Sequence, residues 1–199
     1  MISAVLFDLD GTLADTAPDL GLALNRLLLE EGLQPQPYSA IRPVASHGAR
    51  GLIKLGFGIG ANHPDCARLC ARFLELYDAC FCEETRLFDG IPGLLTVLAE
   101  RGMPWGIVTN KPARFTDPLL AALPLPTMPG VAVSGDTVGV SKPDPRPVYF
   151  AAEMLGVDPA SCLYVGDAER DIEAGRRVGM TTVLAAYGYL SAEDRPDEW

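Results

Sequence analysis

The chain has 199 residues, of which 48% are hydrophobic and 21% charged, a composition typical of globular proteins and unlike that of disordered or fibrous ones. Its formal charge of −10 opposes binding to nucleic acid or to an anionic membrane, because both attract cationic proteins. It lacks the run of about 18 apolar residues that a transmembrane helix needs, and Met1–Ser3 carry no signal-peptide pattern. We therefore expect one compact cytoplasmic domain with an insertion, monomeric or homodimeric, with five reduced cysteines.

The first predicted strand is Ala4–Phe7, an uninterrupted apolar run typical of a buried strand. The next strand centre is Val108, so roughly 100 residues separate the two strands, far more than a single crossover helix requires. An inserted subdomain must therefore occupy part of this interval.

The insertion is predicted to be a small helical bundle. Apolar residues recur at helical spacing in Pro18–Glu31 and again in Cys66–Cys82. Between these helices, Gly56, Gly58 and Gly60 predict a loose segment. We assign the helical cap to residues 16–85, and the core to residues 1–15 and 86–199.

Beyond the insertion, strands and helices alternate along the chain. The predicted strands are Trp105–Thr109, Val131–Ser134, Leu163–Gly166 and Thr182–Ala185. The predicted helices are Ala113–Leu123, Pro145–Leu155 and Arg170–Val178. This alternation predicts an α/β fold in which helices cover a Rossmann-like parallel sheet.

Polar residues follow four of the predicted strands at or near the point where each strand ends. They are Asp8 and Asp10, Thr109 and Asn110, Lys142, and Asp167 with Asp171. The carboxyl ends of parallel strands meet at one edge of a sheet, which is where open α/β sheets bind ligands. We therefore expect these residues to converge on a single site.

The residue types at this edge predict phosphoryl transfer. Asp8, Asp10 and Asp167 offer the hard oxygen ligands that Mg²⁺ prefers, and the ion would relieve the repulsion between the carboxylates. Lys142 adds a fixed positive charge, and Thr109 offers a hydroxyl and a backbone N–H to phosphoryl oxygens. Asp8 is the better candidate nucleophile, which would form an aspartyl-phosphate. Asp10 lies on the same side of the strand, so it would protonate the leaving oxygen and later activate water.

The four stretches resemble the motifs of the haloacid dehalogenase (HAD) superfamily, specifically its phosphatases with a helical cap inserted after the first strand. The matching stretches are Asp8–Leu13, Ile107–Asn110, Lys142–Pro145 and Val165–Asp167 with Asp171. The resemblance implies Asp8 as nucleophile, Asp10 as acid and base, and Thr109, Asn110 and Lys142 as phosphate binders. It also implies Mg²⁺ held by the Asp8 carboxylate, the Asp10 carbonyl and Asp167, with Asp171 as a supporting carboxylate.

Within the superfamily the sequence is most similar to phosphoglycolate phosphatases and to bacterial N-acetylmuramic acid 6-phosphate phosphatases of peptidoglycan recycling. The stretches that carry this likeness are Ser46–Arg50, Leu87–Gly90, Trp105–Pro112 and Tyr187–Tyr189. They imply hydrolysis of a small anionic or sugar phosphate, N-acetylmuramic acid 6-phosphate or 2-phosphoglycolate. Such proteins usually carry a further strand and helix after the position of Trp199, which favours a truncated form.

Single motifs of this sequence are open to other interpretations. A calcium loop starting at Asp8 fails because Leu13 replaces the required glycine and Asp19 the required glutamate. A sugar phosphomutase of the β-phosphoglucomutase type shares all four motifs and is the second hypothesis. Arg50 either reaches a substrate carboxylate or sugar hydroxyl or is a solvated arginine, and Lys111 and Arg114 either hold the anion or begin a helix.

Overall fold

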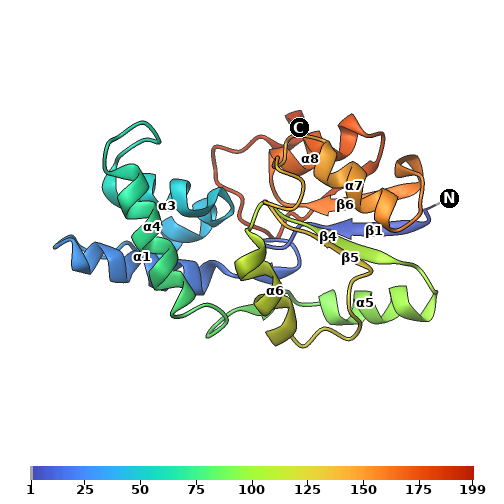
Figure 1. Ribbon diagram of the computed structural model, residues 1–199, viewed down its shortest axis with the longest axis horizontal. Coiled ribbons are helices and arrows are strands. Elements are labelled where there is room, and N and C mark those ends of the chain that lie inside the picture. Colours follow the sequence, from blue (N-terminus) through green and yellow to red (C-terminus); the bar gives the residue numbers. More distant parts are fainter. Residues whose placement is uncertain (1) are drawn as a thin grey trace.

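A computed structural model describes residues 2–199 and contains a five-stranded parallel sheet (Figure 1). Its strand order is β5-β4-β1-β6-β7. The strands are β1 (Ala4–Phe7), β4 (Trp105–Val108), β5 (Val131–Val133), β6 (Cys162–Gly166) and β7 (Thr181–Leu184). In the centre of the sheet, Leu6 pairs with Gly106 on one side and Tyr164 on the other. The predicted parallel α/β fold is confirmed, and every predicted strand matches to within one residue at each end.

Helices cover both faces of the sheet, which explains why the first strand is apolar throughout (Figure 1). Val5 and Phe7 pack towards α5 (Ile91–Glu100) and α6 (Ala113–Ala122). On the opposite face, the neighbours of the first strand are α7 (Arg146–Met154) and α8 (Glu169–Arg177), and the strand residues that pack there are Ala4 and Leu6. The β1 strand is thereby fixed between two apolar layers.

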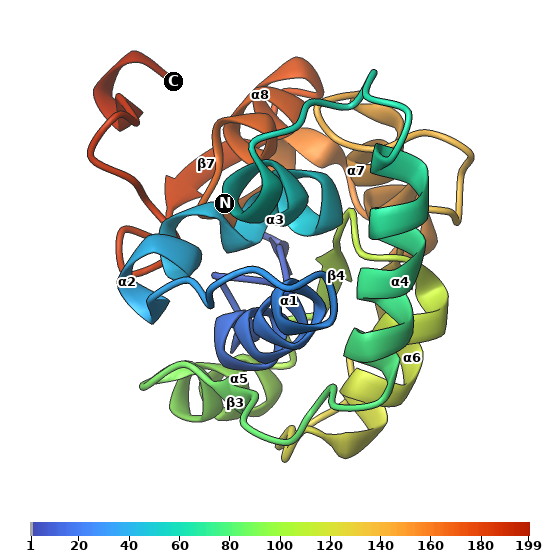
Figure 2. The same ribbon diagram turned by 90° about the vertical axis from the view of Figure 1, so that its left-hand side faces the viewer.

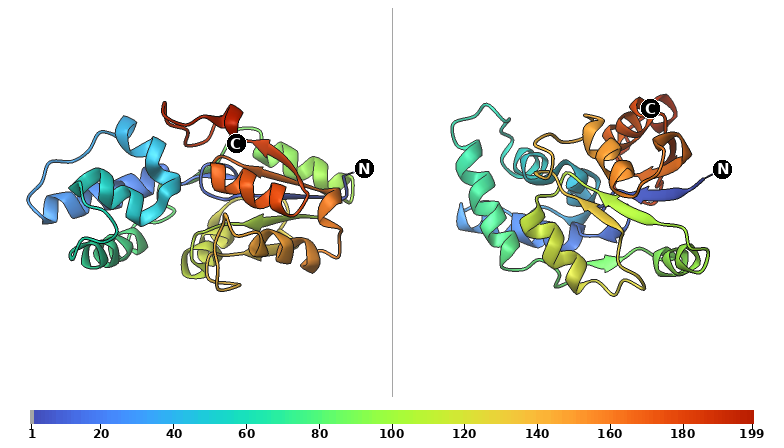
Figure 3. Two further views of the ribbon diagram at one scale, coloured as in Figure 1. Left: turned by 90° about the horizontal axis from the view of Figure 1, so that it is seen from above. Right: turned by 45° about the vertical axis from the view of Figure 1, so that its right-hand side comes forward.

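A second group of helices forms a lobe at one end of the molecule (Figure 3). They are α1 (Ala17–Glu30), α2 (Tyr38–Ile41), the 3-10 helix η1 (Arg42–His47), α3 (Gly48–Phe57) and α4 (Cys66–Asp78). Viewed end-on, α1 lies beside both α3 and α4 (Figure 2). Leu24, Leu52, Ile53 and Phe73 are fully buried between these helices, so the lobe has a hydrophobic core of its own.

Two predictions within this lobe were wrong. The helix predicted over Cys66–Cys82 ends at Asp78, because the chain turns after Tyr77 and Cys82 has a φ of +66°, which an α-helix cannot contain. Gly56 belongs to α3 and not to a loose segment. A Cβ on Gly56 would lie 3.1 Å from Leu24 Cδ1, so this glycine lets α3 approach α1 closely.

A short antiparallel ribbon joins the two places where the chain passes between the sheet and the helical lobe. It pairs β2 (Ala14–Asp15) with β3 (Arg86–Leu87), next to the boundaries predicted at residues 16 and 85. The buried Asp19 carboxylate adds a second link, accepting hydrogen bonds from the backbone N–H of Glu84 and from the N–H and hydroxyl of Thr85. The outgoing and returning chains are therefore tied to each other.

All five cysteines are free thiols, as predicted. The sulfur atoms of Cys66 and Cys70, one turn apart on α4, are separated by 3.9 Å, whereas a disulfide bond is about 2 Å long. Among residues 2–199, none of the helices combines the length and the apolar character needed to cross a membrane.

Candidate active site

The ends of the parallel strands bring the predicted acidic residues together. Asp8 follows β1, Asp167 follows β6, and Asp171 lies in the first turn of α8. Each of the three offers a carboxylate oxygen, and these oxygens lie within 4.8 Å of one another. All three side chains are buried, so bulk water does not compensate their charges and neighbouring groups or a bound cation must do so.

Lys142 is the central cation of this cluster. Its Nζ lies 2.8 Å from Asp8 Oδ1 and 2.7 Å from Asp171 Oδ1. It also donates to the carbonyl oxygen of Val108 at 2.6 Å and to the hydroxyl oxygen of Tyr164 at 2.8 Å. Only 1% of the Lys142 side chain is exposed, so the ammonium group depends on these four oxygens.

Asn110 and Thr109 use part of their hydrogen-bonding capacity within the protein. The Asn110 side chain donates to the Lys142 carbonyl and accepts from the Lys142 N–H, both at 2.9 Å, and thereby orients the loop that carries Lys142. The backbone N–H of Thr109 donates to Val133 in the sheet, so the prediction that it is free for phosphate was wrong. The Thr109 hydroxyl accepts from the Lys111 N–H at 3.1 Å and keeps its own proton to donate.

The electrostatics of the cluster leave it short of positive charge. Burial, together with the neighbouring Asp171 and Asp167 carboxylates, raises the pKa of Asp8 to about 7 despite the opposing effect of Lys142. Burial also raises the pKa of Asp167, against the hydrogen bond from the backbone of Tyr189. Closely spaced carboxylate oxygens with excess negative charge are a suitable environment for a hard divalent cation such as Mg²⁺.

Asp10 lies beside the cluster, where two donors hold one of its carboxylate oxygens. Its Oδ1 accepts from the Thr16 hydroxyl at 2.5 Å and from Lys111 Nζ at 3.0 Å. Lys111 is buried, with its Nζ 4.7 Å from the centre of the Tyr77 ring on α4. The sequence left Lys111 undecided, and the structure places it in the site. Arg114 instead packs over the Phe115 ring at the surface.

A cavity of about 400 Å³ lies between the acidic cluster and the helical lobe. From the sheet side it is lined by Asp8, Asp10, Thr109, Asn110, Lys111 and Arg170. From the lobe, the polar residues that line it are Ser46, His47 and Arg50, and Arg50 is exposed. Sequence reasoning missed Arg170, a half-buried residue of α8 that donates to the Ser46 carbonyl at 2.8 Å.

Tyr189, beyond the last strand, connects the acidic cluster to the start of α1. Its backbone N–H donates to Asp167 Oδ2 at 2.9 Å. Its hydroxyl accepts from the N–H groups of Thr16 and Ala17 at 2.7 and 2.9 Å, and donates to Asp15 Oδ1 at 2.8 Å. Tyr189 thus provides the N-terminal cap that no residue of α1 supplies.

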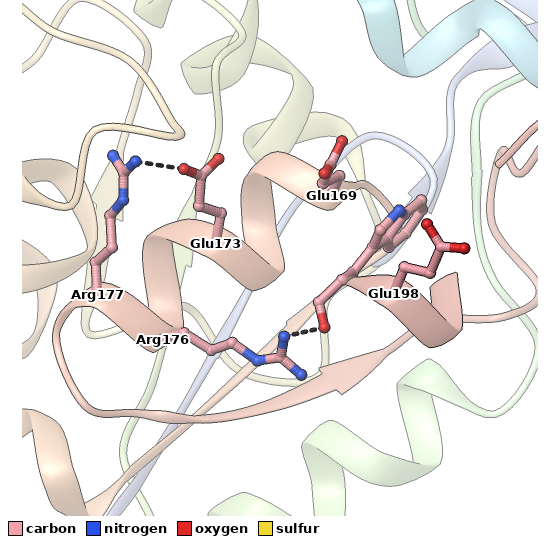
Figure 4. Close-up of a pocket in the computed structure, with 6 residues that line it drawn as sticks. Glu169, Glu173, Arg176, Arg177 and Glu198 are labelled. Carbon is pink, nitrogen blue, oxygen red and sulfur yellow. Dashed lines mark hydrogen bonds and ion pairs between the residues drawn. The ribbon is translucent and has the colours of Figure 1, made fainter. Parts of the chain in front are cut away.

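A second cavity, of about 320 Å³, lies between α8 and the 3-10 helix η3 (Pro196–Glu198) (Figure 4). Charged side chains dominate its lining, among them Glu173 and Arg177, which form an ion pair. None of the predicted site residues lines it. The candidate active site is therefore the cavity above Asp8.

Comparison with known proteins agrees with this geometry. Residues 5–185 match the family of haloacid dehalogenase-like hydrolases. The chain belongs to this family. It is 41% identical, over 198 residues, to the N-acetylmuramic acid 6-phosphate phosphatase of Pseudomonas aeruginosa, covering 100% of this chain and 88% of the relative. It is 42% identical to a phosphoglycolate phosphatase of Xanthomonas campestris pv. campestris, with 98% and 88% covered.

Solved structures of this family share the fold. A crystal structure from Haemophilus somnus, described as a predicted phosphoglycolate phosphatase, superposes with a TM-score of 0.80 at 26% identity, covering 95% of this chain and 87% of that one. The predicted family and the prediction of a hydrolase are confirmed. These relatives are phosphatases, and they give no support to the phosphomutase alternative.

Proposed function

We propose that the protein is a Mg²⁺-dependent phosphomonoesterase that works through an aspartyl-phosphate on Asp8. The observation that carries this proposal is the position of Asp8 on the floor of a cavity, bonded to the buried Lys142 and within 4.8 Å of two further carboxylates. Residues 16–85 are proposed to form a cap that closes over the substrate and excludes water.

The proposed metal ligands are the Asp8 carboxylate, the Asp10 carbonyl and Asp167. Oxygen ligands of this kind suit Mg²⁺, and the raised pKa of Asp8 reflects a site in which negative charge lacks compensation. The ion would supply positive charge to the phosphoryl oxygens and to the carboxylates. Asp171 is bonded to Lys142, so its proposed role is to keep the lysine in place.

The proposed reaction has two displacement steps. Lys142 bonds to Asp8 Oδ1, and the second oxygen of Asp8 attacks phosphorus as the bond to the leaving oxygen breaks. Asp10 gives its proton to that oxygen. In the second step water attacks phosphorus, its proton passes to Asp10, and the bond between Asp8 and phosphorus breaks. Lys142 and the Thr109 hydroxyl are proposed to stabilise the charge on the phosphoryl oxygens.

For the substrate we propose N-acetylmuramic acid 6-phosphate, with 2-phosphoglycolate as the second candidate. The cavity has a partly apolar wall that includes Leu20, Ala45, Phe73 and Phe115, with Arg50 exposed at its edge. The methyl groups of the muramic acid have apolar surface to pack against this wall, and its carboxylate has a partner in Arg50. 2-Phosphoglycolate carries a carboxylate but no methyl group, so it uses less of the cavity.

The nucleophile is tested with Asp8→Asn, using Asp117→Asn as the control because Asp117 is an exposed aspartate on α6. We expect Asp8→Asn to lose about a thousandfold or more of p-nitrophenyl phosphate turnover while its circular dichroism is unchanged. Turnover at the parent rate would exclude Asp8 as nucleophile.

The substrate is tested by comparing kcat/KM on N-acetylmuramic acid 6-phosphate and on 2-phosphoglycolate. We expect the sugar phosphate to be preferred, and weak, equal rates on both would contradict the narrower proposal. An isomerised sugar phosphate in place of free phosphate would instead favour a phosphomutase.

A further inference from the structure

A serine from the helical lobe reaches into the acidic cluster. Ser46 lies in η1, and its hydroxyl donates to Asp167 Oδ2 at 2.9 Å. The same Ser46 oxygen lies 3.4 Å from the backbone carbonyl oxygen of Asp10. Asp167 and the Asp10 carbonyl are both proposed metal ligands, so the Ser46 hydroxyl lies beside the proposed metal site, on the side of the cap.

The position of Ser46 is fixed from two directions. On the sheet side, the half-buried Arg170 donates to the Ser46 carbonyl at 2.8 Å. At the other end of η1, Arg42 donates to the carbonyls of Gly188 and Tyr187 at 2.9 and 2.8 Å. The η1 segment is therefore attached to the core at both ends, which fixes the backbone of Ser46 beside the acidic cluster.

The oxygen spacing around Ser46 matches that of a shared coordination shell. Two oxygens bound to Mg²⁺ at right angles, each at 2.0–2.1 Å, lie about 3 Å apart. The Ser46 oxygen lies 2.9 Å from Asp167 Oδ2, which equals this spacing, and 3.4 Å from the Asp10 carbonyl oxygen, which is somewhat longer. A hydroxyl oxygen is a hard donor of the kind that Mg²⁺ accepts.

We propose that Ser46 is a cap-borne contact of the metal site, supplying an oxygen to the bound ion when the cap is closed. The inference rests on the metal site proposed above. Because coupling between two equilibria is reciprocal, an ion that is bound more tightly by the closed cap also stabilises the closed cap. Binding of the ion then favours the closed cap over the cavity, and opening of the cap lowers the affinity for the ion.

The first test uses Mn²⁺ as a probe, its free concentration being measured by electron paramagnetic resonance without substrate. We expect Ser46→Ala to weaken Mn²⁺ binding about tenfold, the lower end of what loss of a supporting contact costs a metal site. The control is Ser39→Ala, the same substitution at an exposed position of the lobe, which is expected to leave the Kd unchanged. Ser46→Thr keeps the hydroxyl and is expected to recover at least half of the lost affinity.

The second test uses the parent protein and follows amide hydrogen exchange in the segment 42–48 with and without Mg²⁺. We expect exchange to slow on addition of Mg²⁺ in the parent and to respond much less in Ser46→Ala. A parent-like Mn²⁺ Kd in Ser46→Ala, or faster exchange of this segment in the presence of Mg²⁺, would overturn the inference.

The two proposals can fail separately. If Asp8→Asn retains turnover but Ser46→Ala loses metal affinity, the phosphatase mechanism is wrong and the role of Ser46 stands. If Asp8→Asn is inactive, but Ser46→Ala binds Mn²⁺ like the parent and Mg²⁺ does not slow exchange in segment 42–48, the mechanism stands and Ser46 has no contact with the ion.

Discussion

Replacing Lys142 with methionine removes the buried ammonium group while keeping most of the side-chain volume. In the parent, four oxygens surround Lys142 Nζ, two of them from the Asp8 and Asp171 carboxylates. The variant leaves both carboxylates buried without their cation. Removing one partner of a buried ion pair destabilises a protein by about 3–5 kcal/mol, because the remaining charge is uncompensated.

The loss of stability in Lys142→Met is expected to depend on pH. The pKa of Asp8 in the folded protein is raised to about 7, so Asp8 contributes stability at low pH that is lost as the pH rises through about 7. Lys142 opposes this rise, and its removal pushes the pKa of Asp8 higher. The deficit of the variant relative to the parent therefore grows as the pH rises, and is smaller at pH 5 than at pH 8.

Urea denaturation of the metal-free parent and Lys142→Met proteins at pH 5 and pH 8 measures the difference in their free energies of unfolding, and thermal unfolding gives a second measure. At pH 8 the midpoint of thermal unfolding should fall by about 6–20 °C, at 2–4 °C per kcal/mol for a chain of this size. Lys54→Met, at an exposed lysine of α3, is the matched control and should change stability by less than about 0.5 kcal/mol. A deficit below about 1 kcal/mol at pH 8, or a larger deficit at pH 5 than at pH 8, would refute the reasoning.

Three further predictions concern the surroundings of the site. Gly11 has a φ of +89°, and a Cβ there would lie only 2.2 Å from Asp167 Oδ2. Gly11→Ala should therefore lower turnover at least about tenfold and destabilise the protein by about 1–3 kcal/mol. Gly93→Ala, the control in open space, should do neither. Asp19→Ala should cost about 2–4 kcal/mol in urea denaturation, because three donors lose their acceptor, and a cost under about 0.5 kcal/mol would contradict this. Calorimetric Mg²⁺ affinity should be about tenfold weaker at pH 6 than at pH 8, because a proton competes for Asp8, and equal affinities would exclude Asp8 as a ligand.

The fold was predictable because its strongest signals are local. Ala4–Phe7 is apolar on both faces of the strand, and the structure packs Phe7 on one side of the sheet and Leu6 on the other. The convergence of Asp8, Lys142 and Asp167 followed from topology, since parallel strands must end at one edge. Residues about 130–160 positions apart could therefore be placed together before any contact was known.

What escaped prediction depends on contacts between distant segments. The two-residue strands β2 and β3 are too short to show a period, and only their pairing defines them. Gly56 looks like a helix breaker in sequence, but its role is the close approach of two helices. Lys111 and Arg170 are charged residues near helix starts, and nothing local distinguishes a cation that lines the cavity from a fully solvated one.

The order in which this chain is synthesised determines when the hydrogen bonds of Tyr189 can form. A ribosome makes Asp8 about 180 residues before Tyr189, so the hydrogen bonds of Tyr189 to Asp167 and to the start of α1 cannot form during that interval. At 5–20 residues per second, that delay is about 10–40 s. The central strand β1 must likewise wait for its partner β6. Until Tyr189 is synthesised, a nascent chain therefore carries Asp8 without the hydrogen bonds that join Asp167 to the start of α1, and the proposed site is incomplete.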